Sequence, residues 1–187
     1  MVKKINTCVF ISGTGSNLNS LIASSKSYNF PIKIKLVISN NKNAIGNLIA
    51  KKNNIPIKLL PYDNKKNFEK KALIEMTKRK IKFLCLAGFM KLLSKKFIKK
   101  FNNKIVNIHP SLLPKYKGLN THERVIKNKE KFSGCTVHFV NSKLDSGKII
   151  LQKKVLISKN DSIKSLKQKI LLQEHKLYSK SIISIFK

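Results

Sequence analysis

The residues of this 187-residue sequence that are best suited to chemistry are Asn107 and His109, just before Pro110. Residues 104–109 are apolar enough for a buried strand, and alternate side chains of a strand share a face, so the two polar residues are predicted to point the same way. Pro110 ends the strand because it has no backbone N–H. An amide and an imidazole that emerge together can stabilise an oxyanion and carry a proton. The same pattern is also typical of a capped strand with two satisfied polar residues.

A carboxylate that could work with this pair is Asp145, in the sequence Asp145-Ser146-Gly147. It follows an expected strand at residues 134–140 and precedes another at residues 148–157. A carboxylate beside an imidazole favours the charged ring and raises its pKa. Asp-x-Gly is equally common in ordinary turns, where the carboxylate bonds its own backbone. The residues alone leave both interpretations open.

A glycine turn over residues 12–18 ends the first expected strand. Gly13 and Gly15 can take backbone angles closed to other residues and can expose N–H groups at the start of a helix. That arrangement suits a phosphate, helped by the positive end of the helix dipole. Leu18 stands where G-x-G-x-x-G would need its third glycine, and the turn is not a Walker loop. A plain strand-to-helix connection has the same composition.

The scaffold for these residues follows from alternating hydrophobic patterns. Strands are expected at residues 4–12, 32–39, 56–60, 83–87 and 104–109, with helices at residues 17–27, 44–53, 68–80, 94–101 and 121–128. The two strands at residues 134–140 and 148–157 are expected to pair antiparallel, and Asp161 to cap the final helix. We therefore predict an α/β fold: one domain with a mostly parallel, doubly wound, Rossmann-like sheet, an antiparallel C-terminal strand pair and a long final helix. Ligands of such sheets lie beyond the carboxyl ends of the strands.

The composition is that of a globular protein, with 42% hydrophobic residues. No apolar run approaches the roughly 18 residues that a membrane helix needs. The N-terminus does not resemble a signal peptide, so the cytoplasm is the expected location. Cys8, Cys85 and Cys135 are expected to be buried thiols. No Cys or His cluster has metal-ligand spacing, and no metal is expected.

The net charge of +32, from 40 basic and 8 acidic residues, raises the question of nucleic-acid binding. Only Arg79 and Arg124 are arginines, although recognition of phosphates and bases favours the planar guanidinium. The lysines are also spread along the whole chain. Drift towards Lys, Asn and Ile codons explains this composition better than specific nucleic-acid recognition, although the field should still attract anionic substrates.

Several segments occur in an order that resembles the phosphoribosylglycinamide formyltransferase family, the folate-dependent enzymes of purine synthesis. They are Ser12-Gly13-Thr14-Gly15-Ser16-Asn17-Leu18, Leu86-Ala87-Gly88-Phe89-Met90, Asn107-Ile108-His109-Pro110-Ser111-Leu112-Leu113-Pro114, His138-Phe139-Val140, Leu144-Asp145-Ser146-Gly147 and Gln173-Glu174-His175. The resemblance covers essentially the whole chain. The Asn-x-His-Pro segment is specific to folate-dependent formyltransferases, and the glycine turn to the glycinamide ribonucleotide branch.

The resemblance implies transfer of a formyl group from 10-formyltetrahydrofolate, as co-substrate, to the amine of glycinamide ribonucleotide, with no metal. The catalytic residues that it implies are Asn107, His109 and Asp145. It implies a ribonucleotide site at Gly15, Ser16, Asn17, Leu18 and Glu174. It implies a folate site at Lys66, Met90, Lys91, Leu92, Leu93, Asn107, Asn141 and Leu144. The N-terminal half of the single domain, residues 1–187, would bind the ribonucleotide phosphate, and the C-terminal half the folate. The expected partners are small-molecule substrates, without a membrane, and the expected state is a monomer or a weak homodimer.

Two alternatives stay open within the same chemistry, and one outside it. Methionyl-tRNA formyltransferase normally adds a C-terminal domain and formyltetrahydrofolate hydrolase an N-terminal one, so neither is the expected match. A basic nucleic-acid-binding protein is disfavoured by the low arginine content and by 7% aromatic residues. Among the other histidines, His122 is expected at the surface and His175 in a structural role. His138 shares a strand with Thr136 and could face either the site or the core.

Overall fold

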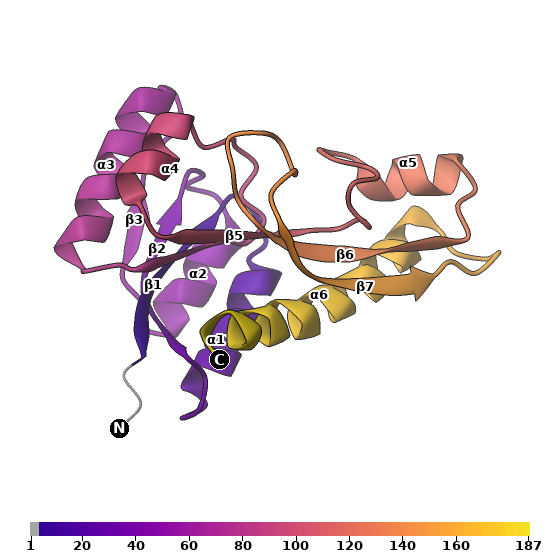
Figure 1. Cartoon of the computed structure of the whole chain (residues 1–187), viewed down its shortest axis with the longest axis horizontal. Coiled ribbons are helices and arrows are strands. Elements are labelled where there is room, and N and C mark those ends of the chain that lie inside the picture. Colours follow the sequence, from indigo (N-terminus) through magenta and orange to yellow (C-terminus); the bar gives the residue numbers. More distant parts are fainter. Residues whose placement is uncertain (1–3) are drawn as a thin grey trace. The chain divides into compact units, whose positions relative to one another are not determined.

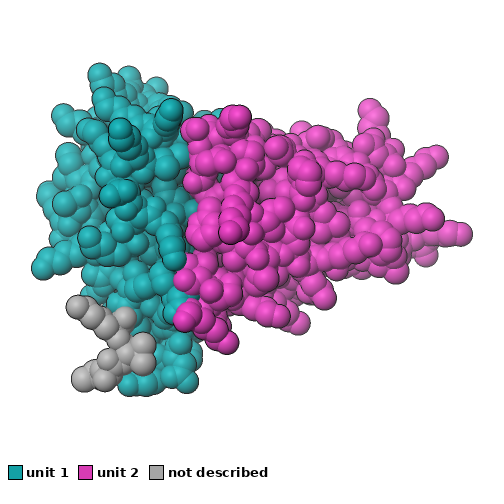
Figure 2. All heavy atoms as spheres, viewed as in Figure 1, with its two compact units in different colours: residues 1–106, 186 teal, residues 107–185, 187 magenta. Residues whose placement is uncertain are grey.

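A computed structural model describes residues 4–187, in which strands and helices alternate along the chain (Figure 1). The strands are β1 (Ile5–Ile11), β2 (Ile32–Ser39), β3 (Ile57–Leu59), β4 (Phe83–Leu86), β5 (Lys104–His109), β6 (Phe132–Phe139) and β7 (Ile149–Leu156). The helices are α1 (Ser16–Lys26), α2 (Ile45–Lys52), α3 (Lys65–Lys78), α4 (Lys95–Phe101), α5 (Thr121–Lys127) and α6 (Ile163–Phe186). The chain divides into two compact units, and the boundary falls within β5, between Val106 and Asn107 (Figure 2).

Unit 1 is a parallel sheet with helices on both faces. Its strands follow the order β3-β2-β1-β4, and β1 pairs in parallel with both β2 and β4. Helices α1 and α2 lie on one side of these strands, and α3 and α4 lie on the other (Figure 1). The aromatic core is centred on Phe10, whose ring centroid lies 5.3 Å from that of Phe89 and 5.8 Å from that of Phe68. This packing fixes β1 and therefore the loop that follows it.

Unit 2 contains the end of β5, the antiparallel pair β6–β7, and the helices α5 and α6. The register of the pair runs from Phe132 opposite Leu156 to His138 opposite Ile149, with an irregularity between Val137 and His138. Helices α5 and α6 lie on opposite sides of this pair (Figure 1). Helix α6 has 24 residues and buries Leu166, among others, along one face.

The predicted fold class is confirmed: a mostly parallel α/β fold with an antiparallel C-terminal pair and a long final helix. The cap of α6 was predicted one residue too early. Ser162 is the N-cap, and its hydroxyl accepts a hydrogen bond from Ser165 N, whereas Asp161 accepts hydrogen bonds from Ser165 Oγ and Lys169 Nζ. Either residue type can cap a helix, so the pattern could not separate them. No helix within residues 4–187 is both long enough and apolar enough to cross a membrane.

Candidate active site

The last residues of β5 bring a carboxamide and an imidazole to one face of the strand. Val106 and Ile108 are buried on the opposite face, as the alternation requires. His109 is only 5% exposed, whereas Asn107 is partly accessible to solvent. The imidazole is therefore enclosed by protein, while the carboxamide beside it can still be reached by a ligand.

Both ring nitrogens of His109 face acceptors. Nδ1 lies 3.3 Å from Asp145 Oδ2, and Nε2 lies 2.8 Å from the backbone oxygen of Tyr116. A carbonyl oxygen and an ionised carboxylate can only accept, so each contact is most favourable when the nitrogen carries a hydrogen. The surroundings of the ring are thus complementary to a doubly protonated imidazole.

Asp145 reaches His109 because the loop between β6 and β7 turns sharply. Asp145 has a left-handed backbone with φ of 42°, and its Oδ2 accepts a hydrogen bond from Gly118 N at 2.9 Å. A Cβ on Gly147 would lie 1.7 Å from the oxygen of Phe139, so only glycine fits at that point of the turn. The Asp-x-Gly sequence is therefore a real turn whose carboxylate is turned towards the histidine.

Burial and hydrogen bonding act against each other at this pair. Burial lowers the pKa of His109 below its ordinary value, although the Tyr116 carbonyl and Asp145 both oppose this shift. Burial would raise the pKa of Asp145, but the nearby side chain of His138, the hydrogen bond from the Gly118 N–H and the neighbouring His109 outweigh it and hold that pKa low. Asp145 thus raises the pKa of the histidine, as predicted, although desolvation dominates the net shift.

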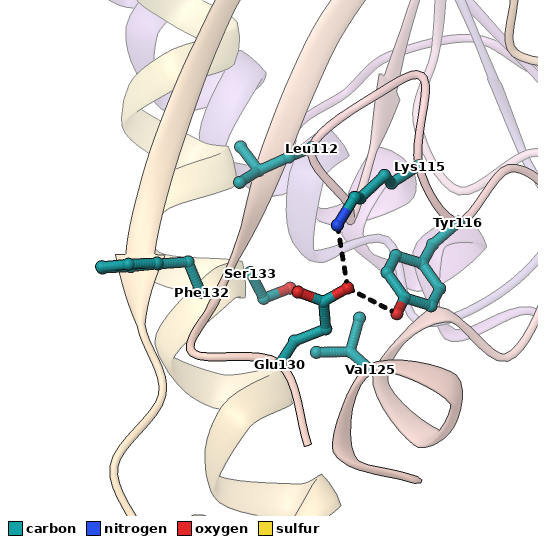
Figure 3. A pocket seen from close by; sticks show the side chains of 7 residues that line it. All are labelled: Leu112, Lys115, Tyr116, Val125, Glu130, Phe132 and Ser133. Carbon is teal, nitrogen blue, oxygen red and sulfur yellow. Dashed lines mark hydrogen bonds and ion pairs between the residues drawn. The ribbon is translucent and has the colours of Figure 1, made fainter. Parts of the chain in front are cut away.

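Tyr116 supports the imidazole from the far side. Its backbone is left-handed, with φ of 56°, and its hydroxyl donates to Glu130 Oε1 at 2.9 Å. Lys115 Nζ lies 3.0 Å from the same oxygen. Figure 3 shows this group on the wall of a cavity of about 220 Å³ lined by Leu112, Lys115, Tyr116, Val125, Glu130, Phe132 and Ser133. The carbonyl that meets His109 is therefore held by a side chain anchored outside the site.

His138, left undecided by the sequence, faces the site. It is 2% exposed, its Nδ1 lies 2.9 Å from the oxygen of Phe139, and its Nε2 lies 3.3 Å from Asn107 Nδ2. Its Nε2 also lies 3.6 Å from Asp145 Oδ1. Thr136, on the same face of β6, accepts from Leu113 N and donates to the oxygen of Ser111. In the sequence, the two polar residues Thr136 and His138, two positions apart on a buried strand, were the sign that this face of β6 contacts the segment after β5.

The glycine turn of unit 1 is built for close backbone approach. Gly15 has φ of 76°, and a Cβ there would lie 2.5 Å from the Cα of Gly46 at the start of α2. Gly13 is exposed, and a Cβ added there would meet no atom within 4 Å. Asn17 and Leu18 are buried in the first turn of α1, so Leu18 can offer only its backbone to a ligand. The exposed residues Gly13 and Thr14, just before an 11-residue helix, are compatible with an anion beside the helix N-terminus.

The segment after β4 carries the expected folate-contacting residues of unit 1. Met90 is 61% exposed and Leu92 53%, whereas Leu93 is buried. Ser12 Oγ accepts from Met90 N at 2.9 Å, and the hydroxyl of Tyr62 donates to the oxygen of Leu92 at 2.9 Å. Lys91 Nζ lies 5.3 Å from the centre of the Tyr62 ring. The segment is thus anchored while two of its apolar side chains stay open.

The remaining predicted binding residues lie in different settings. Lys66 is exposed in the first turn of α3, and Leu144 is 45% exposed in the loop after β6. Asn141 Oδ1 accepts from Lys143 N and Ser146 Oγ, both at 3.0 Å, and so shapes that loop. Glu174 is buried on α6. These placements leave the predicted binding roles as predictions.

The other titratable groups have less direct links to the site. His122 is half-buried rather than on the surface, and burial lowers its pKa. Cys8, Cys85 and Cys135 are buried free thiols, as predicted. Among residues 4–187, no group of three or more His, Cys, Asp or Glu side chains could hold a metal ion. The sequence gives no sign of Tyr116 and Gly118, whose contributions come from the backbone and leave no side-chain signal.

Comparisons with known proteins converge on one chemistry. The profile of the Formyl transferase family matches residues 5–182. The chain is 43% identical over 180 residues to phosphoribosylglycinamide formyltransferase of Haemophilus influenzae, a match over 95% of this chain and 84% of that protein. It is 41% identical over 179 residues to the human trifunctional purine biosynthetic protein adenosine-3, covering 94% of this chain but only 18% of that protein.

Solved structures agree with the sequence matches. The crystal structure of phosphoribosylglycinamide formyltransferase from Anaplasma phagocytophilum superposes with a TM-score of 0.91 at 40% identity, covering 98% of this chain and 87% of that one. The Bacillus halodurans enzyme gives a TM-score of 0.93 at 32% identity, covering 97% of this chain and 95% of that one.

Proposed function

This chain belongs to the phosphoribosylglycinamide formyltransferases of the formyl transferase family, and we propose that Asn107, His109 and Asp145 carry its catalysis. Its reaction is the formylation of glycinamide ribonucleotide in de novo purine biosynthesis. The observation that carries the catalytic assignment is the 3.3 Å approach of His109 Nδ1 to Asp145 Oδ2, on the strand face that also bears Asn107.

We propose 10-formyltetrahydrofolate as the formyl donor. The amine nitrogen of the ribonucleotide forms a bond to the formyl carbon, and the bond from that carbon to N10 of the folate then breaks. One proton moves from the amine to N10, so the products are the formylated ribonucleotide and tetrahydrofolate. These steps need a hydrogen-bond donor that stabilises the developing oxyanion and a group that carries one proton.

In this proposal Asn107 supplies the hydrogen-bond donor for the oxyanion. Its carboxamide is partly accessible, and its Nδ2 is placed by a neighbouring ring nitrogen 3.3 Å away. An amide N–H aimed at the carbonyl oxygen stabilises the charge that develops during attack. Removal of such a donor typically lowers kcat by about 100-fold or more.

The His109–Asp145 pair is the proton carrier in this proposal. Burial lowers the pKa of His109 below its ordinary value, which favours the neutral ring, and the pair can take up the proton of the amine during the reaction. Once protonated, both of its N–H groups find acceptors, in Asp145 and the Tyr116 carbonyl. The surroundings therefore stabilise the transient imidazolium without holding it permanently.

The ribonucleotide phosphate is proposed to bind the glycine turn of unit 1, at Gly15, Ser16 and Asn17. Support comes from the exposed residues Gly13 and Thr14 just before α1, from the helix dipole and from the positive field of the whole chain. The proposed folate contacts of unit 1 are Met90 and Leu92, which expose apolar surface, and Leu144 is a further proposed contact in unit 2. Glu174 is proposed to contact the ribonucleotide.

We propose cytoplasmic activity on small molecules, by a monomer or a weak homodimer, with no specific nucleic-acid partner. Three buried free thiols are typical of a reducing compartment. One plant relative, from Vigna unguiculata, carries the description "chloroplastic", so cell fractionation is the appropriate check. Sedimentation of the purified protein would establish the number of subunits.

The test of the proposed function is a formyl-transfer assay with three acceptors. Purified protein is mixed with 10-formyltetrahydrofolate and either glycinamide ribonucleotide, methionyl-tRNA or water alone, and release of tetrahydrofolate is followed. We expect turnover only with the ribonucleotide. Turnover with tRNA, or formate release without an acceptor, would identify one of the two related activities instead.

The catalytic roles are tested by His109→Ala and Asp145→Asn, which should each lower kcat by about 100-fold or more while both substrates still bind. Lys127→Ala, on the surface of α5, is the control and should leave kcat unchanged. Near-normal turnover in either site variant would show that the pair does not carry the proton.

A further inference from the structure

His138 contributes a buried imidazole that the proposed catalytic steps do not use. It is 2% exposed on β6, and its Nε2 is directed at the carboxamide of Asn107, with 3.3 Å between that nitrogen and Nδ2. Buried polar side chains are normally hydrogen-bonded, and each partner restricts the form that the side chain can take. The contacts of this ring therefore determine which of its nitrogens carries hydrogen.

The contact at Nδ1 fixes the tautomer. Nδ1 lies 2.9 Å from the backbone oxygen of Phe139, and a carbonyl oxygen can only accept. Nδ1 must therefore carry the hydrogen, and in the neutral ring Nε2 presents its lone pair. The only group that can complement a lone pair is a donor.

The tautomer of His138 in turn determines the orientation of the Asn107 carboxamide. With its NH₂ group towards Nε2, the carboxamide of Asn107 donates one hydrogen to the lone pair and keeps a second N–H for another acceptor. With the amide turned over, its oxygen would face the lone pair of Nε2, and two acceptors would oppose each other. The neutral ring thus selects one of the two amide orientations.

We propose that His138 is a positioning residue that holds the Asn107 carboxamide with an N–H directed at the reacting carbonyl oxygen. This inference rests on the proposed function, in which Asn107 stabilises the oxyanion. Without the lone pair at Nε2, the amide can present its oxygen to the substrate instead, and an oxygen repels a developing oxyanion. The role of His138 is thus expressed in the chemical step more than in substrate binding.

Asp145 is the competing route by which His138 could act. Its Oδ1 lies 3.6 Å from His138 Nε2, which is too long for a good hydrogen bond. The two closer partners of Asp145, His109 Nδ1 and Gly118 N, both contact its other oxygen, Oδ2, and the contact of His138 Nε2 with Asn107 Nδ2 is the shorter one, at 3.3 Å. The geometry therefore points to Asn107 as the residue that His138 controls.

The first experiment compares His138→Gln with His138→Leu. Glutamine can place its carbonyl oxygen near the position of Nε2 and so restore the acceptor, whereas leucine fills space without one. We expect His138→Leu to lower kcat by about 10- to 100-fold with KM nearly unchanged, and His138→Gln to recover most of the loss. Equal losses in the two variants, or losses confined to KM, would overturn the proposal.

A double-mutant cycle identifies the residue through which His138 acts. In an Asn107→Ala background, His138→Leu should lower kcat little further, because the carboxamide that His138 orients is gone. In an Asp145→Asn background, it should keep its full effect. The proposal would be overturned if the effect of His138→Leu on kcat were undiminished in the Asn107→Ala background and largely lost in the Asp145→Asn background. Normal kcat in Asn107→Ala alone would instead refute the proposed function of Asn107, so the two failures are distinguishable.

An NMR measurement on the unmutated protein avoids any effect of substitution on folding. The nitrogen shifts of isotope-labelled histidine separate protonated from unprotonated ring nitrogens, and His138→Gln assigns the signal of this ring. We expect the neutral ring to carry its hydrogen on Nδ1 and to leave Nε2 unprotonated. The opposite tautomer, or a doubly protonated ring, would overturn the proposal.

Discussion

At the scale of single residues, the site depends on what surrounds one ring. His109 has acceptors on both sides, and one of them is the backbone carbonyl of Tyr116, a residue with a left-handed backbone. Such a backbone is uncommon for a tyrosine and persists only where the surroundings hold it. Here the hydroxyl donates to Glu130 and accepts from Asn128 Nδ2, both at 2.9 Å. Side-chain anchors outside the site thus set the position of a carbonyl inside it.

Tyr116→Phe should therefore weaken catalysis without touching a substrate. The variant keeps the ring and loses both hydroxyl hydrogen bonds, so we expect a several-fold lower kcat and a loss of about 1 kcal/mol in the free energy of unfolding. Steady-state kinetics and urea unfolding measure the two effects. Tyr28→Phe, at a tyrosine that is 64% exposed, is the control. If both variants turn over equally fast, the carbonyl of Tyr116 is held by the backbone alone.

The buried histidines also predict how stability depends on pH. Burial lowers the pKa of His109 and of His122 in the folded protein, so the unfolded chain binds protons more readily at these sites. Their contribution to stability is therefore complete above the unfolded pKa of about 6.5 and is lost as the pH falls below it. The pKa of Asp145 is also lowered, which adds a further loss at more acidic pH, below about 4.

We expect the free energy of unfolding to be smaller at about pH 5.5 than at about pH 7.5. His122→Gln, outside the proposed catalytic trio, should reduce that difference because glutamine does not titrate. Urea unfolding at the two pH values measures it. An unchanged difference in the variant would mean that this ring is protonated as easily in the fold as in the unfolded chain.

At the scale of elements, the turn between β1 and α1 serves two purposes that can be separated. Gly15 lets α1 approach α2, because a Cβ there would lie 2.5 Å from the Cα of Gly46, and its φ of 76° disfavours other residues. Gly13 is in open space, so a methyl group there disturbs no packing. It would only crowd the exposed N–H groups to which a phosphate is proposed to bind.

Gly13→Ala and Gly15→Ala form a matched pair on this turn. Gly13→Ala should fold normally and raise KM for the ribonucleotide, while KM for the folate changes little. Gly15→Ala should lower the free energy of unfolding by about 1–3 kcal/mol, because it adds both a clash and backbone strain. Thermal unfolding and KM values for each substrate separate the two effects. An unchanged ribonucleotide KM in Gly13→Ala would place the phosphate elsewhere.

Most elements could be predicted because their patterns are local. The strand ending at His109 has an alternating face and a proline stop, and both can be read along the chain. The network behind His109 could not be predicted. Tyr116 and Gly118 act there through backbone atoms, whose positions depend on a left-handed residue and a long loop. The approach of Asp145 to His109 was expected from the resemblance and not from the pattern, because the two residues are 36 positions apart along the chain.

At the scale of the whole molecule, several of the few acidic residues make hydrogen bonds or ion pairs that hold structure or form part of the proposed site. Only 8 are present against 40 basic residues. Glu69 accepts from the backbone N–H of Ser94, the N-cap of α4, and Glu75 lies between Lys58 and Arg79. Asp161 bonds Lys169, and Asp145 lies in the proposed site.

The resulting field should act on substrate capture and not on the chemical step. Both proposed substrates are anions, and charge attraction that extends beyond direct contact raises the rate of encounter until salt screens it. We expect kcat/KM for the ribonucleotide to fall several-fold between about 0.05 M and about 0.4 M potassium chloride, with kcat nearly constant. The contacts around His109 are buried, so salt screens them far less, and kcat should therefore not fall with kcat/KM. Sucrose at matched osmolarity is the control for effects other than screening. If kcat/KM does not depend on salt, the lysine excess plays no part in capture, and compositional drift alone accounts for it.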